Sequence, residues 1–445
     1  MISISDLKSA SPSADRPQSI GSKSISRQEQ TWLIVALCCI TFLLRFAMAW
    51  FIYHAKPMEF WAHSIEPERI AVAILNGEGY SSPFTPHTGP TAWNPPLYPL
   101  IIAASFKIFG IYSVKAACLL LGINFVCATI TTAIMYRIGS ICFGPRAAFF
   151  GAMFWAISLD TVMWAARNWE SSLGALFATL ITLWYIRLLQ SPTKTRDWVI
   201  YGALWGLCGL TTATLLALMP IPMAVLFFRK HRESRNRVMI AFLTTIILLT
   251  PWTVRNYLRF GTFIPIRGNF GTELWAGNHP GVHGPLAESL HPLIDVKERD
   301  AYAAMGEARF MASRQKLAMD FIRHNPRQFA ALTRARIVSF WTAQRVLSST
   351  TNYWCTALTW TSFILLLRKK TRLFAAPFAA ALILFPIPYY ISHAENYFRF
   401  PIEPLLLLLA ADTMNRLISL IERTMSKKSI VSLVQPDPSP KGEIS

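Results

Sequence analysis

The sequence predicts an all-α polytopic membrane protein, a bundle of about ten transmembrane helices with two large outer loops that carry short amphipathic helices. Hydrophobic residues make up 53% of the 445 residues and charged residues only 15%, whereas soluble proteins carry about 25% charged residues. The apolar residues gather in runs of about 20, the length that a helix needs to cross the hydrocarbon core. These runs do not alternate between polar and apolar positions, which argues against a membrane β-barrel.

Lysine and arginine residues set the expected orientation. The net charge is +19, and the basic residues cluster in short segments between apolar runs, which is typical of cytoplasmic loops. Lys23 and Arg27 precede the first run, so the N-terminal end is expected on the cytoplasmic side, as is the basic C-terminal end. The membrane is expected to be the cell inner (plasma) membrane. No nucleic-acid-binding motif accompanies the charge, so no nucleic-acid partner is expected.

The chain is expected to form one membrane domain between two tails. Residues 1–29 are rich in Ser, Lys and Arg and are expected to be a disordered cytoplasmic tail. Residues 30–425 form the transmembrane domain, with outer loops at 54–112 and 253–345, and residues 426–445 form a second cytoplasmic tail. Seven cysteines lie in or at the ends of apolar segments without metal-ligand spacing, so we interpret them as packing residues.

Ten apolar segments are expected to cross the membrane. The run Leu97–Phe109 is not one of them, because it is short for a crossing and a crossing there would place the basic loops outside. It is expected to be a membrane-surface or re-entrant helix. The expected spans are Trp32–Tyr53, Ser113–Tyr136, Ala147–Ala166, Ser171–Leu189, the two arms of a hairpin at Trp198–Phe228, Val238–Trp252, Trp354–Leu367, Leu373–Ile391 and Pro404–Leu420.

The first outer loop contains the main candidate for chemistry, Glu66. A short helix is expected from Glu66 to Leu75, because apolar residues recur there at helical spacing, and Gly77 and Gly79 end it. Aromatic residues frame Glu66, and a partly apolar pocket would raise the pKa of a carboxyl group and suit it to general-base work. Glu68 is the nearest rival, but helical spacing puts it on the solvent side.

A second signal is a set of outer residues that could hold an anion. Arg255, Arg267 and Arg399 lie on the outer side, where the cytoplasmic preference of basic residues does not explain them. Arginines that converge on one site favour an anionic ligand such as a lipid phosphate. Glu170 opens a span on the same side, and His393 stands close to Arg399. The sequence contains no P-loop or dinucleotide-binding motif, so any donor is expected to be a lipid rather than a nucleotide.

Five short motifs follow one another along the outer segments. They are an acidic residue before a helix that ends in Gly-x-Gly-Tyr, a proline pair, a Trp-acid pair, a Pro-Trp-x-x-Arg-Asn element and an Arg-x-Pro-x-x-Pro element. From Trp32 to about Leu420 the chain thereby resembles membrane glycosyltransferases of the GT-C superfamily, in the branch with the protein O-mannosyltransferases and the bacterial aminoarabinose transferases. The motifs lie at Glu66 to Tyr80, Asn94 to Tyr98, Trp169–Glu170, Pro251 to Asn256 and Arg399 to Pro404.

The resemblance implies an inverting transfer of a sugar from a polyprenyl-phosphate carrier to a hydroxyl acceptor (lipid, polysaccharide or protein) on the outer face. It implies Glu66 as the general base and Glu170 as a residue that orients the acceptor or Glu66. Some relatives carry Lys where this chain has Asn94, which shifts phosphate binding to the arginines. No metal-ligand set is predicted, although Glu66 and Glu170 could share a divalent cation. The implied substrate-binding residues are Glu68, Asn94, Arg255, Asn256, Arg267, His393 and Arg399.

Two other functions are weighed beside this one. A transporter or flippase for a lipid-linked sugar or another anion would use the same arginines, and Arg45 and Asp160 inside expected spans favour it. Most charges lie at span ends, which favours chemistry at the membrane surface. A non-catalytic assembly protein with the same fold is the third interpretation. Substitution of Glu66 distinguishes it, because only an enzyme would lose activity.

Overall fold

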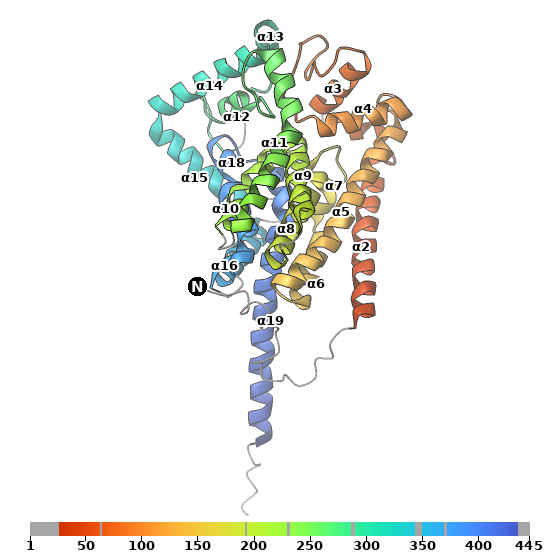
Figure 1. The fold of residues 1–445 in the computed structure, drawn as a ribbon, viewed down its shortest axis with the longest axis vertical. Coiled ribbons are helices and arrows are strands. Elements are labelled where there is room, and N and C mark those ends of the chain that lie inside the picture. The colour runs from red at the N-terminus through yellow and green to blue at the C-terminus, as the bar shows by residue number, and fades with distance from the viewer. Residues whose placement is uncertain are drawn as a thin grey trace, which may run out of the picture.

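The structure, a computed structural model, describes residues 26–62, 65–191, 194–228, 232–285, 290–342, 349–368 and 372–434. These residues are almost entirely helical, and their one pairing of extended backbone is an isolated antiparallel bridge between Ser81 and Pro90. Long helices run side by side through the body of the molecule, and the shorter outer helices gather at its upper end (Figure 1). The all-α membrane fold is therefore confirmed.

Six segments of the described chain are long and apolar enough to cross a membrane, or seven if a bent pair counts as one span. This confirms a multi-pass protein, while the count of ten spans stays a prediction. Three more apolar helical segments are shorter, among them the expected surface helix α4 (Leu97–Phe109), whose bounds match the prediction. The six are α2 (Arg27–Tyr53), α5 (Val114–Cys142), α8 (Ser171–Gln190), Arg235–Phe260 in α11 (Arg232–Phe260), the broken segment Arg372–Ile391, and Tyr397–Ser426 with α19 (Glu403–Val434).

The expected span Ala147–Ala166 is two helices, α6 (Pro145–Ile157) and α7 (Leu159–Ala165), which bend by 54°. A break of this kind leaves the last carbonyl groups of a helix without intrahelical partners. The buried side chain of Arg45 on α2 supplies donors there, and its Nη2 lies 3.0 Å from the carbonyl oxygen of Trp155. The position of Arg45 inside an expected span favoured a transporter. Its hydrogen bonds to the end of α6 give this buried arginine a structural role.

The expected span Leu373–Ile391 is also irregular. It starts as a 3₁₀ turn at Arg372–Ala375, continues as the short α17 (Ala376–Ala379) and a π-helical turn, and ends in α18 (Ile387–Ile391). Pro386 and Pro388 explain the last break, because proline cannot donate a backbone hydrogen bond within a helix.

Helix packing places the two outer regions together at one end of the bundle. In the interior, α19 packs against α6 and α16 (Ser349–Leu367), and α9 (Thr195–Thr211) packs against α8 and α11. After α9 the hairpin returns through a 3₁₀ turn and α10 (Pro220–Phe227). The outer helices are α3 (Ile65–Leu75) and α4 from the first loop, and α12 (Phe270–Gly277), α13 (Val296–Met305), α14 (Glu307–His324) and α15 (Pro326–Thr342) from the second.

Parts of the predicted tails lie outside the described residues. These are residues 1–25 of the N-terminal tail and residues 435–445 at the other end. The boundary predicted between residues 425 and 426 falls inside α19, which continues to Val434.

Candidate active site

Glu66 lies in the first turn of α3, at the outer end of the bundle. Its side chain is only 14% exposed, and its Oε1 lies 3.4 Å from Nε2 of His291. The helix is held there because Ile70 and Ala71 are buried and α3 packs on α4. The carboxylate thus meets a partner from the second outer region instead of pointing into bulk water.

Sequence reasoning did not find His291. Its ring makes edge-on contacts with Phe84 and Trp93, at centroid distances of 5.6 and 5.1 Å, and its Nδ1 accepts a hydrogen bond from the amide of Leu293 at 3.2 Å. A lone histidine in a long polar loop shows no spacing that links it to Glu66, so no signal in the sequence could have found this contact.

The expectation that Glu68 faces solvent is wrong, because its side chain is 1% exposed. The amide Nδ2 of Asn168 donates to Glu68 Oε1 at 2.5 Å, and the hydroxyl of Tyr98 donates to Asn168 Oδ1 at 2.7 Å. Burial raises the pKa of Glu68 to about 9, although the hydrogen bond from Asn168 opposes that shift. Glu68 therefore belongs to the packing of α3 against α4 and the α7–α8 connection.

Glu170 immediately precedes α8 on the same side of the bundle. Burial raises its pKa, while its own backbone N–H and the positive charge of Arg267 oppose the shift and the negative charge of Glu66 adds to it. Glu170 therefore lies within electrostatic range of both Glu66 and Arg267. The catalytic and binding roles predicted for these residues stay predictions.

Arg255 and Arg267 both donate hydrogen bonds to backbone carbonyl groups of the segment that follows α3. Arg255 donates through Nη2 to the carbonyl of Tyr80 and through Nη1 to the carbonyl of Thr91, each at 2.6 Å. Arg267 donates through Nε to the carbonyl of Trp93 at 2.9 Å. The two arginines thus hold residues 80–93 against α11 and the chain that follows it.

Glu273, which was not predicted, joins Arg267 to His393. One of its oxygens lies 3.4 Å from Nη2 of Arg267, and the other lies 3.5 Å from Nε2 of His393. A glutamate on a short helix such as α12 is a common feature, so the sequence offered no reason to select it.

Arg399 belongs to a different network. Its Nε donates to Glu403 Oε2 at 2.7 Å, and its Nη1 donates to the carbonyl of Trp341 at 3.2 Å. The structure therefore brings Arg255 and Arg267 to one segment but does not bring Arg399 to it.

Two asparagines of the predicted set have mainly backbone contacts. Asn256 donates through Nδ2 to the carbonyl of Ile264 at 3.0 Å, which fixes the turn after α11. The backbone carbonyl of Asn94 accepts a hydrogen bond from Tyr80 at 2.8 Å. Its side-chain Oδ1 is buried and accepts no hydrogen bond from the described residues.

Glu307, at the start of α14, connects the two outer regions through hydrogen bonds. Its buried carboxyl group accepts hydrogen bonds from the amide of Ala92 at 2.6 Å, from the hydroxyl of Tyr302 at 2.6 Å, and from the hydroxyl of Thr91. Burial raises its pKa, and these three donors oppose the shift. These hydrogen bonds fix residues 91–92, which lie within the segment 80–93 that Arg255 and Arg267 hold.

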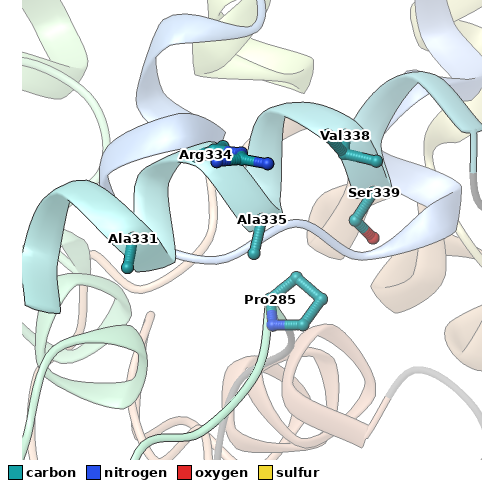
Figure 2. A pocket seen from close by; sticks show the side chains of 6 residues that line it. All are labelled: Pro285, Ala331, Arg334, Ala335, Val338 and Ser339. Carbon is teal, nitrogen blue, oxygen red and sulfur yellow. The ribbon is translucent and has the colours of Figure 1, made fainter.

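A pocket of about 490 Å³ lies elsewhere, between α15 and Pro285 (Figure 2). None of the predicted site residues lines it, so it has no part in the site. Its other lining residues all come from one helix: Ala331, Arg334, Ala335, Val338 and Ser339.

The part of the chain that the structure describes contains no group of three or more His, Cys, Asp or Glu side chains that could hold a metal ion. Two carboxylates, those of Glu66 and Glu170, do not by themselves satisfy the six to eight ligands of Ca²⁺ or the octahedral geometry of Mg²⁺.

Comparisons with known proteins agree with this architecture. A protein-family model described as dolichyl-phosphate-mannose-protein mannosyltransferase matches residues 93–254. The oligosaccharyltransferase of Archaeoglobus fulgidus in its apo form matches over 94% of this chain with a TM-score of 0.55 and 12% identity. The chain shares the fold of that oligosaccharyltransferase. The expected resemblance to the GT-C superfamily is thereby confirmed.

The chain spans about half the length of that oligosaccharyltransferase, 53% in the apo structure. The same enzyme with an inhibitory peptide and a dolichol-phosphate matches 94% of this chain at a TM-score of 0.50 and 13% identity, covering 53% of the enzyme. ArnT from Cupriavidus metallidurans bound to undecaprenyl phosphate matches at a TM-score of 0.37 and 12% identity, over 88% of this chain and 79% of ArnT. No curated protein matches the sequence.

Proposed function

We propose that this protein is an inverting glycosyltransferase. It moves a sugar from a polyprenyl-phosphate carrier to a hydroxyl acceptor of a lipid, polysaccharide or protein, at the extracytoplasmic face of a cell inner membrane, with both chain ends in the cytoplasm. The family match and the GT-C-type fold support the class of reaction. A dolichol-phosphate bound to the archaeal relative supports a lipid-phosphate donor. The observation that carries the proposal is the mostly covered carboxylate of Glu66 at the outer end of the bundle, 14% exposed and 3.4 Å from His291, with Glu170 within electrostatic range of it.

The proposed chemistry needs a base on one side of the sugar and positive charge on the other. Glu66 removes the proton from the acceptor hydroxyl, and the acceptor oxygen attacks the anomeric carbon. The bond between that carbon and the phosphate oxygen breaks in the same displacement, and the lipid phosphate leaves with the electron pair. Positive charge held ready at the leaving oxygen stabilises this transition state, most strongly where water is excluded.

Arg267 is the proposed partner of the leaving phosphate. Arginine carries five N–H donors, and the described contacts of Arg267 use Nε and Nη2, so Nη1 can donate to an anion. Its side chain is 30% exposed, which gives a ligand access to it. Arg399 was predicted for the same role, but its side chain is only 10% exposed and its Nε lies 2.7 Å from Glu403 Oε2, so we assign it to holding the start of α19.

Substitution of Glu66 tests the proposal. Purified, folded E66Q protein should consume lipid-linked sugar at least about 100-fold more slowly than wild type, because general-base catalysis contributes about that much or more. E59Q is the matched control, since Glu59 lies in the same outer loop, forms an ion pair with Lys56, and is half exposed. Near-normal turnover by E66Q would contradict the proposal. A flippase would move the carrier without releasing its sugar.

A further inference from the structure

We propose that His291 is a positioning residue for Glu66, which holds one carboxylate oxygen by its Nε2–H and turns the other toward the acceptor hydroxyl. This inference rests on the proposed base role of Glu66. It adds a residue from the second outer region to a catalytic group in the first.

The contact itself is the first observation. His291 Nε2 lies 3.4 Å from Glu66 Oε1, and both side chains are mostly covered, at 27% and 14% exposure. Catalytic hydrogen bonds are often long in the absence of substrate and tighten when it binds. The separation is therefore within the reach of a working contact.

The second observation fixes the protonation pattern of the ring. The backbone amide of Leu293 lies 3.2 Å from His291 Nδ1 and can only donate, so Nδ1 is the acceptor. In a neutral imidazole the other nitrogen then carries the proton. Nε2, 3.4 Å from Glu66 Oε1, is then the nitrogen that carries the proton, so in the proposed arrangement the imidazole donates to the carboxylate rather than competing with it for a proton.

The third observation is that the ring has little freedom to turn away. Its edge-on contacts with Phe84 and Trp93 hold it on two sides. The carbonyl of the same residue accepts hydrogen bonds from the amides of Ile294 and Asp295, at 2.8 and 2.9 Å, which fixes the backbone just before α13. A ring held in this way can fix the orientation of a carboxylate.

The consequence for the reaction is geometric. Oε1 is occupied by His291, and among the described residues no side chain donates to Oε2, so Oε2 is the oxygen that receives the acceptor proton. His291 does not touch the acceptor in this arrangement and exchanges no proton. Its contribution is to place Oε2, and misplacing a reacting group by about 1 Å can cost about 100-fold in rate.

Two substitutions separate the functions of the two ring nitrogens. In H291N the amide oxygen can still accept from Leu293, because asparagine forms this turn readily, but the side chain no longer reaches Glu66. In H291Q the amide nitrogen can still reach Glu66. We expect H291N to lower kcat about 10- to 100-fold with little change in the KM for the lipid donor, and H291Q to recover part of the loss. H87N is the matched control, since His87 is an exposed histidine of the first outer loop.

A double substitution shows whether His291 acts through Glu66. E66D withdraws the carboxylate by one methylene and breaks the contact, so H291N should cost much less in the E66D background than in wild type. Equal costs in both backgrounds, or equal losses in H291N and H291Q, would overturn the inference and assign the histidine to folding. Thermal unfolding of each variant checks that the comparison is made on folded protein.

The outcomes for the two proposals are distinguishable. If E66Q abolishes turnover while H291N turns over normally, the positioning role fails and the glycosyltransferase proposal stands. If E66Q turns over normally, the proposed function itself fails, and the role of His291 fails with it.

Discussion

The guanidinium group of Arg255 on α11 donates to the backbone carbonyl of Tyr80, 2.6 Å away on the first outer loop. The same group donates to the carbonyl of Thr91 at 2.6 Å and lies 4.8 Å from the ring centroid of Trp252. One side chain thus closes residues 80–91 into a loop on the outer end of a membrane helix. A motif that implied phosphate binding is here also a clamp on the backbone beside Glu66.

The clamp predicts that R255K loosens the loop. A lysine ammonium group cannot reach two carbonyls with the fixed fork of a guanidinium group, and each buried hydrogen bond that is lost costs about 1–3 kcal/mol. We expect a lower free energy of unfolding and faster amide hydrogen exchange in residues 80–93. R259K is the control, because Arg259 lies one helical turn further on and is exposed. Unchanged exchange in R255K would mean that Arg255 serves a ligand alone.

Because the carboxyl group of Glu68 is buried, we expect the stability of the protein to fall as the pH rises. Its pKa is about 9 in the folded protein, above the ordinary value of 4.5, because the group is buried. Between these values the folded state holds a proton that the unfolded state has lost, so this group makes stability fall as pH rises. The Tm of the wild type should therefore decrease from pH 5 to pH 9.

The E68Q variant isolates that contribution. A glutamine resembles the protonated acid in shape, and its carbonyl can still accept from Asn168. E68Q should match the wild type in Tm near pH 5 and fall less as the pH rises. A parallel decline of both proteins with pH would show that Glu68 does not hold a proton in the folded state.

Local patterns in the sequence predicted the elements that depend on local chemistry. The bounds of α4 and the start of α8 follow from apolar periodicity and helix-starting residues, and the glycines after α3 end it with positive φ. The break at Gly306 could not be predicted from periodicity, since apolar residues recur at helical spacing from Val296 to Asp320, yet a φ of 73° at Gly306 divides α13 from α14.

Contacts between distant segments could not be predicted in this way. The buried carboxyl group of Glu68 is bonded to Asn168, 100 residues further along the chain, and helical spacing within α3 carries no information about that contact. The partner of Glu66 comes from the second outer region, far along the chain. The order of the motifs identified Glu66 and Glu170 in the sequence. The side chains that surround them come from distant segments and are brought there by tertiary packing.

Gly277 lies at the end of α12, and we expect the addition of one methyl group there to lower the stability of the protein strongly. A Cβ there would lie 1.8 Å from the carbonyl oxygen of Ser392, and the carbonyl of Gly277 itself accepts from Arg336. Backbone must move to admit the methyl group, so G277A should destabilise the protein by about 1–3 kcal/mol. G284A is the control, since no atom of the described residues lies within 4 Å of a Cβ at Gly284 and its φ is ordinary. Equal Tm values for the two variants would contradict the close approach of α12 to the end of α18.

The contacts of Arg45 lead us to expect that the bend between α6 and α7 depends on this buried cation. Its guanidinium donates to the carbonyls of Trp155 at 3.0 Å and Ala156 at 3.3 Å, the last turn of α6. In R45M these carbonyls lose their donors inside the membrane, where no water replaces them, and each buried group left unsatisfied costs about 1–3 kcal/mol. Unfolding of R45M in detergent should therefore occur at a clearly lower temperature than that of R146M, whose arginine forms only an exposed ion pair with Glu422.

The same substitution also reaches the candidate active site. The helix after the bend leads to Asn168, which orients Glu68, and to Glu170. If the bend relaxes, R45M should lose turnover even at temperatures where it remains folded, whereas R146M should not. A stable R45M protein with normal turnover would show that the break in this span is set by the chain itself and needs no buried arginine.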